Sequence, residues 1–212
     1  MTEERREPLI NAPWSALVLV GSIIVAYAWQ RLSGADALIT QYGVSGAALR
    51  QGDYAVLVTS LFLHGGWPHV LGNAAFGLAF ATPVARRMGA DAKGGAIFFI
   101  FYLFCGVLSG LVFALHHWGD AEVAVGASGA LAGCMGATSR LMGPGPQLAA
   151  FNSPPVVSMA AAWIGINLVF GLFLVGWAPG SGGAPLAWEA HLGGYMAGLI
   201  LIGPSLRLLG RI

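Results

Sequence analysis

The chain has 212 residues, of which 57% are hydrophobic and 9% are Asp, Glu, Lys or Arg. Because soluble domains carry charge on roughly a quarter of their residues, this composition excludes a soluble globule, and it is too apolar for a disordered or collagen-like chain. The net charge of +1 gives no field for nucleic-acid binding, and the two cysteines lie outside any disulfide or zinc motif. What remains is a polytopic α-helical membrane protein.

Six segments are apolar and long enough, or nearly so, to cross a bilayer as helices of about 20 residues. In chain order they are residues 13–30, 69–85, 94–115, 128–142, 156–177 and 190–206. The fourth is short and rich in glycine and alanine. The sequence therefore predicts an all-α fold, a six-transmembrane-helix bundle with a short central fourth span. Residues 1–12 would form a cytoplasmic tail, 13–209 the membrane domain and 210–212 a cytoplasmic end.

Basic residues are distributed unevenly between the connecting segments. With the N-terminus in the cytoplasm, the outer segments hold only Arg31 and Arg50. The other eight basic residues lie on the inner side: Arg5, Arg6, Arg86, Arg87, Lys93, Arg140, Arg207 and Arg211. This positive-inside bias predicts a multi-pass protein of the cell (inner) membrane with both termini in the cytoplasm.

Polar side chains within the six expected spans are few, and each is a candidate for function because placing it in lipid is costly. His69 and Asn73 lie one helical turn apart at the start of the second span. Ser128 opens the fourth span and His191 opens the sixth. All three spans run from outside to inside, so the four side chains are expected at one depth near the outer surface. Asn167, the lone amide of the fifth span, is left without a role.

Serine and histidine at helix ends can carry out nucleophilic hydrolysis. Ser128 stands in the motif Gly-Ala-Ser-Gly, where a helix N-terminus would offer free backbone N–H groups to an oxyanion. His191 could take the serine proton as a general base and return it to a leaving amine. His69 and Asn73 could donate hydrogen bonds to the same oxyanion from a third helix. The sequence therefore predicts a hydrolase that needs no cofactor and no metal ion.

Five glycines near these side chains are expected to permit close helix packing: Gly126, Gly129, Gly133, Gly194 and Gly198. The last four form two small-xxx-small pairs. Each feature alone has a plain structural explanation, since serine caps helices, a histidine at a helix end bonds a carbonyl and glycine pairs simply pack. The coincidence of four polar side chains at one depth and on one side favours the catalytic explanation.

The motifs at these positions resemble the rhomboid family of intramembrane serine proteases, in its six-span bacterial form. They are HGGWPHVLGN at residues 64–73, GASG at 126–129 and AHLGG at 190–194. The resemblance extends from residue 54 to residue 198, and the order and helix placement of the motifs match the family. It implies a protease whose substrates are single-pass transmembrane proteins, cut near their outer helix ends within the lipid bilayer. The oligomeric state stays open.

The resemblance also implies a role for each residue. Ser128 would be the nucleophile and His191 its general base, a dyad without an acidic third member. His69 and Asn73, together with the backbone amide of Ser128, would form the oxyanion hole. The family's histidine at the position of His64 is structural rather than catalytic. The catalytic centre would therefore face the outer side of the membrane.

The chain departs from the family pattern at four positions. These are Ala55, Val56, Ala85 and Ala132. None of them removes a catalytic atom, but Ala132 stands where an aromatic ring often packs on the catalytic histidine. The departures keep open a second hypothesis, a catalytically silent scaffold that binds transmembrane clients. A third hypothesis, a small transporter or channel, predicts buried carboxylates, and the six expected spans contain neither Asp nor Glu.

Two outer loops carry further expectations. By the same resemblance, residues 177–188 would form a mobile cap over the site, and the fifth span would act as a lateral gate. His116 and His117 lie in the loop between the third and fourth spans, close to Asp120 and Glu122. A metal site is conceivable there, but the sequence favours a solvated loop.

Overall fold

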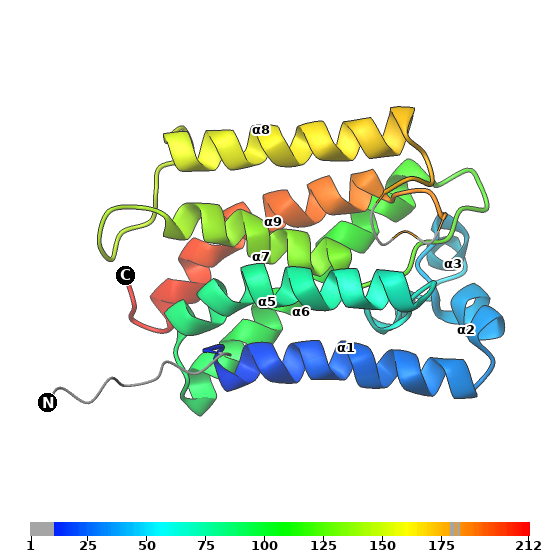
Figure 1. The fold of residues 1–212 in the computed structure, drawn as a ribbon, viewed down its shortest axis with the longest axis horizontal. Helices are drawn as coiled ribbons and strands as arrows, with labels where there is room; N and C mark the ends of the chain where they lie inside the picture. Colours follow the sequence, from blue (N-terminus) through cyan, green and yellow to red (C-terminus); the bar gives the residue numbers. More distant parts are fainter. Residues whose placement is uncertain (1–10, 179–180, 182) are drawn as a thin grey trace, which may run out of the picture.

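The computed structural model describes residues 11–178, 181 and 183–212, and all regular structure in this part of the chain is helical apart from one bridge between Val44 and Ala124. The long helices are α1 (Trp14–Leu32), α5 (Trp67–Met88), α6 (Ala92–His116), α7 (Ser128–Leu141), α8 (Pro154–Leu168) and α9 (Trp188–Leu208) (Figure 1). Between α1 and α5 lie the short elements α2 (Ala35–Tyr42), α3 (Gly46–Arg50), α4 (Val56–Thr59) and η1 (Ser60–Phe62), and η2 (Val169–Phe173) continues α8 as a π-helical turn. The predicted all-α fold is confirmed.

The long helices lie side by side, with α8 along one edge of the bundle and α1 along the opposite edge (Figure 1). α7 lies between them and packs against α5, α6 and α9, and every residue from 129 to 139 is buried. It is the short central helix that the sequence predicts. α8, in contrast, buries only Val156 and Asn167 and exposes most of its apolar surface.

Each expected span falls on one long helix. Three described helices are long and apolar enough by themselves to cross a membrane: Trp14–Leu32, Ala92–His116 and Pro154–Phe173. The six crossings therefore stay a prediction, whereas the membrane-type apolar helices are present. The helix expected over residues 156–177 ends at Phe173, because Leu174 leaves helical geometry with a φ of −117° and a ψ of 48°. The chain then turns at Gly176 with a φ of +79°.

Local sequence determines where the helices that carry the candidate residues begin. α5 begins at Trp67 with Pro68 in its first turn, where the missing N–H leaves no hydrogen bond unmade. The chain enters α7 through Gly126, whose φ of +125° is rare for residues with a side chain. A Cβ on Gly126 would also lie 2.7 Å from the His69 ring. Glycine at this position therefore lets the first turns of α5 and α7 approach each other.

Glycines also let α7 and α9 pack backbone to backbone. A Cβ on Gly194 would overlap the backbone of Gly129, and a Cβ on Gly198 would overlap the carbonyl oxygen of Gly133. The two small-xxx-small pairs thus face each other across one contact. This contact fixes the distance between the first turns of α7 and α9.

We expect Gly198→Ala to lower the free energy of unfolding by about 1–3 kcal/mol, the usual cost of overpacking, because its methyl group would push α9 away from α7. The thermal unfolding midpoint in detergent measures this effect. Gly21→Ala in α1 is the matched control, since a Cβ there meets no atom within 4 Å. Equal midpoints for the two variants would contradict the packing role of Gly198.

Candidate active site

Ser128 and His191 meet where α7 and α9 begin. Ser128 is the first residue of α7, and His191 lies in the first turn of α9. The Oγ atom of Ser128 lies 2.7 Å from Nε2 of His191, which is a hydrogen-bond distance. His191 is only 6% exposed, whereas Ser128 is half-buried and lines a cavity. A serine nucleophile and its general base require a contact of this kind.

Asn167 of α8 determines which nitrogen of His191 carries the hydrogen. Its Oδ1 atom lies 2.8 Å from His191 Nδ1, and its Nδ2 donates to the carbonyl oxygen of Trp163 at 2.9 Å. Because that carbonyl can only accept, the amide orientation is fixed and Oδ1 must face the imidazole. His191 therefore donates through Nδ1, which leaves Nε2 free to accept the Ser128 proton.

Asn167 has no role in the sequence-based prediction, and the structure places it fully buried inside the site. One signal could have found it. Asn167 lies near the middle of the predicted span 156–177, a depth at which a polar side chain in lipid is costly. Depth alone, however, does not tell which side of its helix faces the bundle.

Aromatic rings hold the imidazole in place. The ring centroid of Trp163 on α8 lies 5.6 Å from that of His191, with the planes at 34°. Phe76 of α5 stacks on Trp163 at 5.3 Å and 27°. Ala132 of α7 offers no ring to the histidine, so the ring that packs on the imidazole comes from α8.

His69 and Asn73 of α5 line the same cavity as Ser128. Asn73 is 4% exposed, and its Nδ2 has no hydrogen-bond partner among the described residues, an arrangement that costs about 1–3 kcal/mol. The Gly65 N–H makes a long, weak hydrogen bond of 3.4 Å to His69 Nδ1, which favours the ring hydrogen of His69 on Nε2. Both side chains pack against Gly126, two residues before the serine. Two N–H donors beside a nucleophile suit a developing oxyanion.

His64 has a supporting position. The side chain of Gln30 holds the His64 backbone through two hydrogen bonds of 2.9 Å each, one to the N–H and one to the carbonyl. The His64 ring packs edge-on against the ring of His69, with centroids 5.0 Å apart. His64 therefore positions His69 and does not itself line the cavity.

The cavity beside Ser128 has a volume of about 480 Å³ and is bounded by α5, α7, α8 and α9. The segment before α9 forms another wall, through Ala178, Ser181, Ala184, Pro185, Leu186 and Ala187. Residues 179, 180 and 182 of the expected cap lie outside the described residues. Most of the lining is apolar, and the polar groups converge on Ser128, which is the pattern of a binding site for an apolar chain.

A comparison with protein families agrees with these motifs. The family model described as Rhomboid domain matches residues 51–207, which is most of the chain and includes Ser128, His191, His69 and Asn73. No curated protein matches the chain. Together with its apolar helices, the family match identifies a polytopic membrane protein. The resemblance seen in the sequence is thus confirmed, and the chain belongs to the rhomboid family.

Proposed function

We propose that the protein is an intramembrane serine endopeptidase that cleaves single-pass transmembrane proteins near their outer helix ends. The observation that carries the proposal is the 2.7 Å contact between Ser128 Oγ and His191 Nε2. The hydrogen bond of Asn167 to Nδ1 supports it, because it leaves Nε2 in the form that accepts a proton. A catalytically silent scaffold would not require a histidine held in one tautomer beside a serine.

The first half of the reaction forms an acyl-enzyme. Ser128 Oγ attacks the carbonyl carbon of the scissile bond while His191 Nε2 takes the hydroxyl proton. The carbonyl oxygen becomes an oxyanion, which accepts hydrogen bonds from Asn73 Nδ2, His69 Nε2 and the backbone N–H of Ser128. The N-terminus of α7 adds its dipole, which favours negative charge. When the intermediate collapses, the protonated His191 gives its proton to the leaving amine.

The second half releases the product. A water molecule attacks the acyl carbon, His191 Nε2 takes its proton, and the same donors stabilise the second oxyanion. Collapse frees the new carboxyl end and returns the proton to Ser128. Asn167 is neutral throughout, so it keeps the ring of His191 oriented without adding charge. It is a positioning residue.

The proposed placement in the inner membrane, with both termini in the cytoplasm and the site toward the outer side, suits this chemistry. Ser128 and His191 begin their helices, so water can reach them from the end of the bundle while a substrate approaches from the lipid. A substrate helix hides its carbonyl groups in its own hydrogen bonds and must unwind before it can be cut. Glycine or proline near the cut site should therefore speed cleavage.

Replacing Asn167 tests its positioning role. Asn167→Leu is expected to lower kcat by about 10²-fold with little change in KM, since the imidazole loses the acceptor that fixes its orientation. Asn167→Asp keeps an oxygen at that place and is expected to retain more of the activity. Both constants are measured with a detergent-solubilised transmembrane substrate, and the unfolding midpoint reports on folding. Equal kcat for Asn167→Leu and wild type would contradict the positioning role of Asn167.

The proposed function is tested with a fluorophosphonate probe and a reporter that carries one transmembrane helix. We expect the probe to label wild type at Ser128, identified by mass spectrometry, and not to label Ser128→Ala. We also expect wild type to cut the reporter. A folded wild-type protein that neither reacts with the probe nor cuts the reporter would instead be the silent scaffold.

A further inference from the structure

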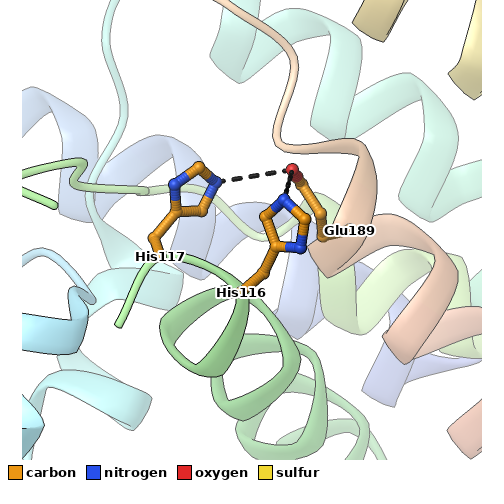
Figure 2. Close-up of side chains that lie close together, drawn as sticks. All are labelled: His116, His117 and Glu189. Carbon is orange, nitrogen blue, oxygen red and sulfur yellow. Dashed lines mark ion pairs between the residues drawn. The ribbon is translucent and has the colours of Figure 1, made fainter. Parts of the chain in front are cut away.

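A second cluster of reactive side chains lies outside the catalytic cavity, where the end of α6 meets the start of α9. His116 is the last residue of α6, His117 follows it, and Glu189 is the second residue of α9. Figure 2 shows both imidazoles turned toward the carboxylate of Glu189. Glu189 is far from the two histidines in the sequence, and the sequence-based prediction grouped the histidines with Asp120 and Glu122 instead.

Two of the three separations between donor atoms are those of metal ligands. Glu189 Oε1 lies 3.4 Å from His116 Nε2 and 3.4 Å from His117 Nε2, and all three atoms lie within 4.8 Å of one another. These separations are long for hydrogen bonds. A tetrahedral zinc ion holds its nitrogen and oxygen ligands at about 2.0–2.2 Å, which places each pair of ligands about 3.4 Å apart.

Asp120 supplies the outer contact that metal-bound histidines usually have. Its Oδ2 lies 2.8 Å from His117 Nδ1, while its Oδ1 accepts from the backbone N–H of Glu122 at 3.0 Å. A carboxylate accepts the Nδ1 hydrogen, so a neutral His117 directs the lone pair of Nε2 at Glu189. Two lone pairs that face each other are satisfied by a proton or by a metal ion between them, and the 3.4 Å separation leaves room for a metal ion. This carboxylate–histidine pattern fixes ring orientation at metal sites.

Burial and access also fit an ion. Glu189 is 8% exposed, and a buried carboxylate requires compensation by a positive charge or by hydrogen bonds. The His116 side chain is 53% exposed, which gives an ion a path from water. Two imidazole nitrogens and one carboxylate oxygen form a donor set that zinc accepts, with water as the fourth ligand.

We propose that His116, His117 and Glu189 bind a Zn²⁺ ion and that Asp120 orients His117. The ion joins the end of α6 to the first turn of α9, two residues before His191. A hydrogen bond from Ser109 Oγ to the Ala190 carbonyl, at 2.8 Å, already joins these helices nearby. Zinc reinforces that junction and stabilises the folded protein in proportion to its concentration.

The test uses full-length protein in detergent without a histidine tag, stripped with a chelator and then titrated with Co²⁺ and Zn²⁺. We expect one ion per chain, a Co²⁺ absorption spectrum of tetrahedral type that Zn²⁺ abolishes, and a higher unfolding midpoint with zinc. His116→Ala and Glu189→Gln should lose these effects, and Asp120→Asn should weaken binding by about 10–100-fold. Glu122→Gln is the control, because Glu122 contributes only its backbone N–H to the cluster.

The variants are compared with chelator present to show that they fold. His116→Ala removes a side chain that is mostly exposed, so its metal-free midpoint should equal that of wild type. Zinc uptake that is the same in wild type, His116→Ala and Glu189→Gln would overturn the site, as would a wild-type midpoint that zinc does not raise. Because binding is read without substrate, this result is independent of whether the protein is a protease.

Discussion

Ser128→Ala and His191→Ala are each expected to abolish cleavage of a transmembrane reporter, and the double variant is expected to be no slower than either. The two side chains act as one unit through their 2.7 Å contact. Without His191 the hydroxyl keeps its proton, and without Ser128 the base has nothing to activate. In a soluble serine protease the loss of either member costs about 10⁶-fold, as much as the loss of both. Initial rates of reporter cleavage measure the effect.

Ser205→Ala is the matched control for these variants. Ser205 also lies on α9, but its Oγ donates to the Leu201 carbonyl one turn earlier and is remote from the cavity. It should retain the wild-type rate. Full activity in Ser128→Ala or in His191→Ala would reject the dyad. Losses that multiply in the double variant would show two side chains acting independently.

Asn73→Ala is expected to slow cleavage by about 10²–10³-fold, the usual cost of losing one oxyanion donor. The structure adds a second expectation. Asn73 Nδ2 is buried without a hydrogen-bond partner among the described residues, which costs free energy that an oxyanion accepting from it would recover. Removing the amide should therefore leave the unfolding midpoint unchanged or raise it. Turnover and midpoint are measured on the same preparation.

The combination of these two results is what identifies an oxyanion donor. A structural asparagine would lower the midpoint when it is removed, and the rate would fall only as the protein unfolds. If the rate and the midpoint fall together, Asn73 belongs to the fold and not to the oxyanion hole. The fluorophosphonate label on Ser128 should still form in Asn73→Ala, more slowly than in wild type.

The site residues that the sequence predicts are those whose placement depends only on their depth in the membrane. The basic loops predict the orientation of the chain, and the distance of Ser128 or His191 from the end of its span predicts its height in the membrane. Neither step requires knowledge of which helices touch. The glycine pairs predict that the helices carrying these residues pack closely, since small residues at that spacing indicate close packing even when the partner helix is unknown.

The residues missed from sequence depend on which side of a helix faces which neighbour. In a soluble protein an apolar stripe gives that information, but lipid is as apolar as the protein interior, so Asn167 and Trp163 stand in a helix with no such stripe. Glu189 and His116 likewise come together only because α9 begins where α6 ends. Such pairs can be recognised only once the packing of the helices in the bundle is known.

α8 buries Val156 near its start and Asn167 near its end, and between them Trp163 packs on Phe76 and His191. The side-chain amide of Asn167 is the group that orients His191. If α8 swings aside to admit a substrate helix, that amide leaves with it, the imidazole can turn, and Nε2 loses its alignment with Ser128. In that case the catalytic pair would be misaligned while α8 is open, and hydrolysis would begin only after α8 has packed back against the bundle with the substrate inside.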